Sequence, residues 1–169
     1  MQFKVGEAVV HPVYGVGHIA TVEKKQFSGL EACVYYQITF PKSIIWAPIE
    51  AQAAIGLRSV TAKRDLNEYR DLIKSPPVLL NSNLPKRHVE VASRLKQGSF
   101  QATCEVVRDL TASGWQKPLG ATNKTILRKT RERLYQEWAT AADISIAEAT
   151  QEIATLLATG NSGSSSEVI

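Results

Sequence analysis

A stretch of short β-prone segments covers residues 3–50 and reads FKVGEAVVHPVYGVGHIATVEKKQFSGLEACVYYQITFPKSIIWAPIE. β-Branched and aromatic residues are frequent in four segments within it, at 8–11, 16–24, 30–40 and 44–49. Gly15 and Gly17 lie where the first two segments meet, at a turn that needs a positive φ angle or a close backbone approach. Four or five short strands with few residues between them predict a small β-barrel of the SH3 or Tudor type.

Helical periodicity replaces the strand pattern beyond a connector at residues 51–60. Five helices are expected from apolar stripes, caps and stop signals: from a Thr61 cap to about 74, at 85–96, from a Ser99 cap onward, at 121–141, and from a Ser145 capping box onward. The sequence therefore predicts an α+β protein. Its parts are a small Tudor/SH3-like β-barrel over residues 1–60, an all-α domain of about five helices over 61–158, and a flexible tail over 159–169.

Composition indicates a soluble globular chain, with 44% hydrophobic and 21% charged residues among 169. No run of about 18 apolar residues occurs, and the start of the chain does not resemble a signal peptide. Cys33 and Cys104 fall in different predicted domains, so we expect reduced thiols. These features predict a cytoplasmic monomer with no membrane contact.

Basic residues concentrate in the middle of the chain. Residues 76–135 hold eleven Lys or Arg against four Asp or Glu, a net charge of +7, whereas residues 136–169 hold five acidic residues and no basic one. This distribution indicates a surface that faces a polyanion such as nucleic acid. The alternative is an ordinary solvated helical face.

Signatures of catalysis are missing from the sequence. His11, His18 and His88 stand at no metal-ligand spacing with either cysteine. The glycine pair at 15 and 17 lacks the rest of a dinucleotide-binding fingerprint, and neither a Walker lysine motif nor a Gly-x-Ser-x-Gly motif occurs. The sequence predicts a binding protein rather than an enzyme, with no cofactor and no metal.

A first candidate binding group lies in the β-rich part and consists of Lys25, Phe27 and Trp46. Phe27 falls in the predicted hairpin loop at 26–29, where nothing forces its burial. Aromatic residues beside a cation are typical of interface hot spots. The alternative is that Trp46 closes one mouth of the barrel.

A second candidate group lies at the start of the helix predicted at 85–96. Lys86 and Arg87 stand in its first turn, where the helix dipole disfavours cations but free N–H groups favour phosphate. A bound polyanion explains them better than solvation does. Leu84 is either a core or staple residue of this helix or an exposed apolar wedge that leans into a DNA step. Three further basic residues share one face of the helix at 121–141: Lys124, Arg128 and Arg131.

Several separated motifs resemble the CarD/CdnL family of bacterial transcription regulators, in the order found there. They are FKVG at 3–6, VVHP at 9–12, YGVG at 14–17, WAP at 46–48, GLR at 56–58 and EVVRDL at 105–110. The resemblance covers about residues 2–158. The β module also occurs in transcription-repair coupling factors, but this chain has no helicase motor.

The resemblance implies a Tudor-like domain that binds a lobe of the RNA polymerase β subunit, and a helical domain that touches promoter DNA at the upstream edge of the melted bubble. In that family the two contacts together stabilise the open complex. By position, the polymerase-binding edge would hold Lys25, Phe27 and Trp46. The DNA contacts, mainly to the backbone, would come from Leu84, Lys86, Arg87, Lys124, Arg128 and Arg131.

Two residues depart from the family pattern. Leu84 stands where the family commonly has a tryptophan wedge, so we expect a weaker wedge or none. Trp46 stands where many relatives have arginine, which would exchange an ion pair for an apolar contact with polymerase.

Two other functions are open on the sequence. The chain could bind nucleic acid independently of polymerase, or it could be a Tudor-like reader whose Tyr35, Tyr36 and Trp46 form an aromatic cage for a modified cation. Strand alternation argues against the cage, because adjacent Tyr35 and Tyr36 must point to opposite faces.

Overall fold

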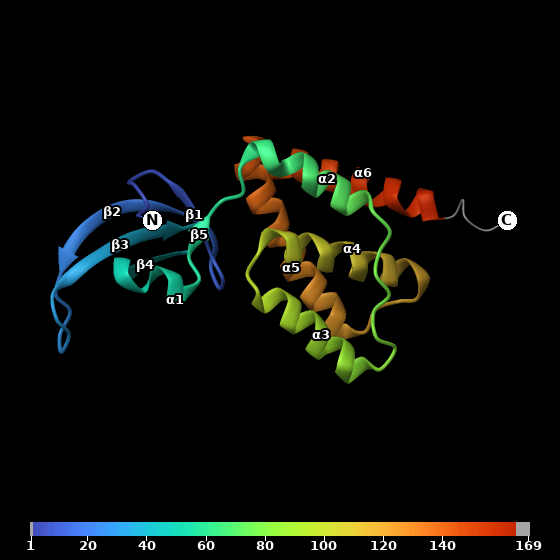
Figure 1. Ribbon diagram of the computed structural model, residues 1–169, viewed down its shortest axis with the longest axis horizontal. Helices are drawn as coiled ribbons and strands as arrows, with labels where there is room; N and C mark the ends of the chain where they lie inside the picture. Colours follow the sequence, from blue (N-terminus) through green and yellow to red (C-terminus); the bar gives the residue numbers. More distant parts are fainter. Residues whose placement is uncertain (1, 165–169) are drawn as a thin grey trace. The chain divides into compact units, whose positions relative to one another are not determined.

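The computed structural model describes residues 2–164, and its chain divides after Val60 into two compact units (Figure 1). The N-terminal unit is built on a β-sheet and the C-terminal unit is built from α-helices. The predicted α+β class is therefore confirmed.

The sheet of the N-terminal unit is antiparallel throughout, with the strand order β4-β3-β2-β1-β5. Its strands are β1 (Ala8–His11), β2 (Gly15–Lys25), β3 (Cys33–Phe40), β4 (Ser43–Pro48) and β5 (Arg58–Ser59). β4 and β5 are edge strands that do not pair with each other, so the five-stranded sheet of this Tudor/SH3-like module is not closed. Between β4 and β5 the chain forms a 3₁₀ turn (Ile49–Ala51) and helix α1 (Gln52–Ile55), and β5 itself is two residues long.

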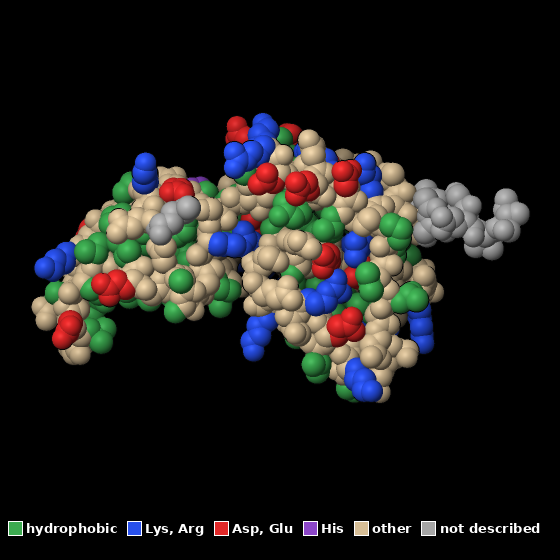
Figure 2. Space-filling model, viewed as in Figure 1, with side chains coloured by type: hydrophobic (Ala, Val, Ile, Leu, Met, Phe, Trp, Pro, Cys, Tyr) green, Lys and Arg blue, Asp and Glu red, His purple; other side chains and the backbone are tan. Residues whose placement is uncertain are grey.

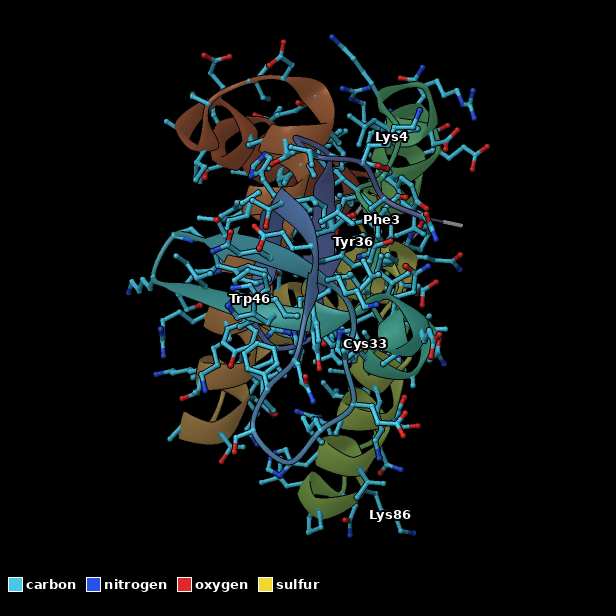
Figure 3. All side chains as sticks on the ribbon, turned by 90° about the vertical axis from the view of Figure 1, so that its left-hand side faces the viewer. Phe3, Lys4, Cys33, Tyr36, Trp46 and Lys86 are labelled. Carbon is cyan, nitrogen blue, oxygen red and sulfur yellow. The ribbon has the colours of Figure 1, made fainter. Side chains whose placement is uncertain are left out.

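One face of the sheet carries the core of this unit. The register places Tyr36 opposite Ala47 and Ile38 opposite Ile45 on that face. The Tyr36 hydroxyl accepts a hydrogen bond from the Phe3 N–H (3.0 Å), and Figure 3 labels both residues. The buried cluster consists of Phe3, Val9, Ile19, Tyr36, Ile38, Phe40, Ala47 and Leu57.

The glycines of the first turn serve two different purposes. Gly15 has a φ of 79°, so it lies in the left-handed region that favours glycine. Gly17 lies beneath Phe40, where an added Cβ would stand 2.6 Å from the ring. The sequence-based expectation of a positive φ or a close approach therefore holds at both positions.

Five α-helices make up the C-terminal unit within the described residues. They are α2 (Leu66–Lys74), α3 (Leu84–Lys96), α4 (Phe100–Gln116), α5 (Ala121–Ala142) and α6 (Ile146–Ser164). α4 packs on α2, α3 and α5, while α6 packs on α2 and α5 (Figure 1).

Two of the three predicted N-terminal caps are confirmed. The Ser99 hydroxyl accepts the Ala102 N–H (3.1 Å), and the Ser145 hydroxyl accepts the Glu148 N–H (3.0 Å). The prediction for Thr61 is wrong, because α2 begins only at Leu66, after a 3₁₀ turn. The Thr61 N–H and hydroxyl instead donate to the buried carboxylate of Glu137 (3.1 and 2.9 Å).

Trp138 on α5 lies at the centre of the helical core and is fully buried. Its indole N–H donates to Glu152 on α6 (3.0 Å), and the same carboxylate accepts from the Arg70 guanidinium of α2 (2.6 Å). The guanidinium lies 5.6 Å from the centre of the Trp138 ring. The Glu152 carboxylate therefore joins α2, α5 and α6 around the largest buried side chain.

Helix α6 continues to Ser164, so residues 159–164 of the predicted flexible tail are helical, and residues 165–169 lie outside the described residues. At Gly160, α6 meets the last turn of α2. A Cβ added at Gly160 would stand 2.9 Å from the Lys74 carbonyl oxygen and 3.3 Å from its carbonyl carbon. These are backbone atoms, which cannot rotate away.

We expect Gly160→Ala to lower the free energy of unfolding by about 1–3 kcal/mol, because overpacking outweighs the gain in helix propensity. Gly114→Ala in α4 is the matched control. Its added Cβ would meet only Leu119 side-chain atoms at 3.4 and 3.5 Å, so this change should raise stability by up to about 1 kcal/mol. Urea unfolding of both variants checks the prediction, and a stabilised Gly160→Ala protein would contradict the packing.

Cys33 and Cys104 are free thiols in separate units. Burial raises the pKa of Cys104, and the charges of Glu137 and Glu105 act in the same direction, so its reactive thiolate form is suppressed. Across residues 2–164, no helix has the length and apolar character to cross a membrane, and no three His, Cys, Asp or Glu side chains are grouped to hold a metal ion.

Candidate functional site

An aromatic cluster lies on the face of the sheet opposite the core. Tyr35 and Trp46 belong to this face, since each neighbours a core-facing residue along its strand. The Phe27 ring, from the loop between β2 and β3, stands edge-on to Tyr35 (centroids 5.0 Å apart) and to Trp46 (6.4 Å). Phe27 remains 37% exposed. Trp46 therefore does not fill the interior of the unit, and the alternative that it closes a barrel mouth is wrong.

Lys25 completes this cluster. Its ammonium nitrogen lies 3.7 Å from the centre of the Trp46 ring, a cation–π contact, and 4.0 Å from the Glu23 carboxylate. The structure thus brings together the three residues predicted from the sequence, and we call Lys25, Phe27, Tyr35 and Trp46 the aromatic patch. Figure 3 shows Trp46 on the sheet of the N-terminal unit.

Tyr35 is the member of the patch that the sequence did not single out for this role. It is 5% exposed, because Phe27 covers it from outside. A hydrogen bond with the Cys33 thiol and then burial raise the pKa of the Tyr35 hydroxyl, so it stays protonated and uncharged. Its ring is a fixed support under Phe27.

The aromatic cage for a modified cation is contradicted. Tyr36 is fully buried on the core face, away from Tyr35 and Trp46. The Trp46 ring face that a ligand cation would use is occupied by the ammonium group of Lys25.

The first turn of α3 holds the second predicted group, Leu84, Lys86 and Arg87, which we call the α3 tip. Asn83 caps this helix by accepting the Lys86 N–H (3.2 Å). Lys86 is exposed, and Figure 3 shows it at the outer end of α3. The Arg87 guanidinium bends back to donate to the Asn81 carbonyl (2.8 Å), which fixes its direction. Leu84 is 54% exposed, so the interpretation of Leu84 as a core residue is wrong.

Apolar surface around the α3 tip extends beyond the predicted residues. Leu79 in the preceding segment is 83% exposed and Val89 is 69% exposed. A shallow hollow beside the tip is lined by Asn81, Pro85, Lys86, Val89, Glu90 and Ser93. Val89 could have been recognised from the sequence, because it falls outside the apolar stripe of its helix, whereas the exposure of Leu79 depends on the path of an irregular segment.

The basic residues predicted on α5 line another shallow hollow together. The hollow is bounded by Lys124, Leu127, Arg128, Arg131, Glu132 and Tyr135. Arg128 is paired with Glu132 (3.4 Å), and Arg131 donates from Nη2 to the Thr111 hydroxyl (3.0 Å). Arg131 is half-buried, so part of its role is to hold α5 against α4.

Fewer than the eleven Lys and Arg residues of the stretch 76–135 are available on its surface, although the net charge of +7 already allows for their acidic partners. Arg94 and Arg108 both bond to Asp109 inside the unit. On the face that Figure 2 shows, Lys and Arg side chains alternate with Asp and Glu over the helices instead of forming one continuous patch. The cations that face solvent are thus local groups, and one of them is the α3 tip, whose first turn holds no acidic residue.

Two family patterns match this sequence, one for each unit. The pattern described as "CarD-like/TRCF RID domain" matches residues 3–61, and "CarD, C-terminal domain" matches residues 69–154. The chain belongs to the CarD family. The family resemblance inferred from the sequence motifs is therefore confirmed.

CarD-family membership makes the chain a transcription regulator of a type distinct from enzyme families. The domain family matched by residues 3–61 interacts with RNA polymerase. A Bacillus subtilis (strain 168) protein named "Putative transcription factor YdeB" is 28% identical over 137 residues, which cover 80% of this chain and 89% of that protein.

Proposed function

We propose that this CarD-family protein binds a lobe of the RNA polymerase β subunit through its aromatic patch and contacts promoter DNA at the upstream edge of the bubble through its α3 tip. The two contacts together stabilise the open complex. The observation that carries the proposal is the aromatic patch itself, because residues from β2, a loop and β4 form one partly exposed group beside an edge strand.

The aromatic patch is suited to a protein partner. Phe27 and Trp46 are held by ring contacts with each other, and Lys25 covers one face of Trp46, so little side-chain freedom is lost on binding. Rigid aromatic side chains beside a cation dominate interface hot spots. β4 adds an edge whose outer side is open for contact with the partner.

The α3 tip is suited to a nucleic-acid backbone. Lys86 and Arg87 lie in the first turn of α3, where the positive end of the helix dipole favours phosphate. Asn83 already accepts the Lys86 N–H, so the phosphate contacts would come from the two side chains. Leu84 is exposed beside them and supplies an apolar contact to a base step. Lys124, Arg128 and Arg131 supply further phosphate contacts on α5, and all of these contacts are independent of sequence.

Tethering to polymerase explains how so small a basic surface can hold DNA. Non-specific DNA binding has a Kd of about 1–100 µM at physiological salt. Attachment to polymerase raises the effective concentration of the α3 tip near DNA to about the millimolar range, which would nearly saturate such a site. Polymerase would then bring the protein to promoters, and the DNA contact would stabilise the open complex.

A protein that binds nucleic acid independently of polymerase is the second candidate function, favoured by the net charge of +7 over residues 76–135. The distribution of this charge argues against it, because on the face shown in Figure 2 the Lys and Arg side chains alternate with Asp and Glu and form no continuous basic surface.

Replacing one cation of the α3 tip tests the DNA contact. Arg87→Ala should shorten the lifetime of open complexes about fivefold and make the slope of log K against log salt shallower by about 0.9, the value for one phosphate contact. Polymerase affinity should not change. Arg64→Ala is the matched control, since Arg64 is an exposed arginine of the same unit (side chain 88% exposed) outside the tip. An unchanged lifetime and slope in Arg87→Ala would remove the α3 tip from the proposal.

A further inference from the structure

A buried carboxylate joins the three segments that meet behind the α3 tip. The side chain of Asp109, on α4, is fully buried. Its Oδ1 accepts the backbone N–H of Val78 (3.0 Å) and the Nε–H of Arg108 (2.8 Å), and its Oδ2 accepts an Nη2–H of Arg94 (2.9 Å). Both oxygens of this carboxylate are thereby bound, by three donors in all, each from a different direction.

The partners of Asp109 flank the α3 tip on both sides along the chain. Val78 belongs to the irregular segment that leads into α3, and Arg94 lies about two turns beyond Arg87 on α3 itself. Arg108 extends the network by donating to the Ser75 hydroxyl (2.8 Å) and the Leu72 carbonyl (3.3 Å) at the end of α2. The entry segment and the body of α3 are thus fixed to the same atom group.

Few other contacts hold α3 in place among the described residues. It packs chiefly on α4, and Val91 is the one residue of α3 that is buried. Helix packing through one buried and one half-buried apolar residue, Val91 and Leu95, leaves the direction of a helix poorly determined, because rotation and sliding cost little. Arg94 adds a second fixed point through Asp109 and through Glu105 (3.3 Å).

Stability alone is a weak reason for this arrangement. Buried ion pairs are often no more stabilising than apolar residues of the same volume, so their directional bonds matter where a segment must be held at one angle. We propose that Asp109 is a positioning residue that fixes the direction in which Leu84, Lys86 and Arg87 project toward DNA. This inference rests on the proposed DNA contact of the α3 tip.

Asp109→Asn tests the proposal in the intact protein. Asparagine has the same shape, but its NH₂ group must face a donor of Val78, Arg108 or Arg94. At least one of the hydrogen bonds to residue 109 is therefore lost. Amide hydrogen exchange should become about tenfold faster in residues 78–90 and stay unchanged in α5 and α6. The open-complex lifetime should fall about fivefold with unchanged polymerase affinity, as expected for residues coupled through one network.

The change in net charge caused by Asp109→Asn cannot produce the expected result. Asp109→Asn makes the protein more positive by one unit, which by itself would strengthen DNA binding, so a shortened lifetime cannot arise from charge. Glu152→Gln is the matched control, because it removes one charge and breaks the Arg70–Glu152 pair of the same unit without touching α3. It should leave exchange in residues 78–90 and the open-complex lifetime at their wild-type values.

Combination with Arg87→Ala separates this proposal from the proposed function. If Asp109 acts through the tip, adding Arg87→Ala to Asp109→Asn should shorten the lifetime much less than Arg87→Ala does alone. Independent, multiplicative effects of the two changes, or exchange accelerated evenly over all helices, would overturn the positioning role. An effect of Arg87→Ala with none of Asp109→Asn would also overturn it while leaving the proposed function intact. If Arg87→Ala leaves the open-complex lifetime unchanged, both the DNA contact of the α3 tip and the positioning role of Asp109 are excluded.

Discussion

Phe27→Ala combined with Trp46→Ala is expected to weaken binding of the intact protein to RNA polymerase about 100-fold, because two aromatic hot-spot residues are removed together. Phe27 is the exposed edge of the aromatic patch, and Trp46 is the ring against which both Phe27 and Lys25 rest. The double variant therefore removes the contact surface and also releases Lys25 from its fixed position. Titration of labelled protein with core polymerase measures the loss.

The fold should survive this change, since neither side chain belongs to the buried cluster of the N-terminal unit. Val5→Ala combined with Val13→Ala is the control, because both valines are exposed (64% and 67%) in the same unit outside the patch. The control should bind polymerase like the wild type. Equal affinities for all three proteins would show that another surface contacts polymerase.

Leu84→Trp is expected to lengthen the lifetime of open complexes about fivefold or more, since an aromatic ring stacked on a base contributes about 1–3 kcal/mol. Leu84 is exposed at the start of α3, so a larger side chain requires no space inside the protein. Tryptophan adds a flat surface and an indole N–H that leucine lacks. Dissociation of preformed complexes in the presence of a competitor measures the lifetime.

The same ring at the start of another helix controls for non-specific binding by an exposed tryptophan. Ile146→Trp adds it at the start of α6, at a position that is 54% exposed, as Leu84 is. It should leave the lifetime within about twofold of the wild type, as expected for a surface residue outside the contact. Equal gains from both variants would mean that Leu84 does not stand at the bubble edge.

Local signals in the sequence predicted the elements of secondary structure well. Ser99, Ser145 and the paired prolines after Lys74 act on their nearest neighbours, so helix boundaries follow from them directly. Thr61 failed as a cap because a buried carboxylate 76 positions away, Glu137, takes both of its donors.

The composition of both candidate sites was visible in the sequence, but their geometry was not. Lys25, Phe27 and Trp46 were predicted to act together, whereas the supporting place of Tyr35 follows only from the register of β3 and β4. Charge counting placed Arg94 and Arg108 on a basic surface. Their partner Asp109 is in the same charge count, and only the packing of α3 on α4 brings the three together.

The dissociation rate of open promoter complexes, measured with increasing concentrations of wild-type protein and of the Phe27→Ala plus Trp46→Ala variant, tests the two-contact account most directly. The account predicts that wild-type protein slows dissociation in a saturable way and that the variant, whose α3 tip is unaltered, has no effect at the same concentrations. A variant that slows dissociation as well as the wild type does would contradict the account, because DNA contact would then act without the polymerase tether.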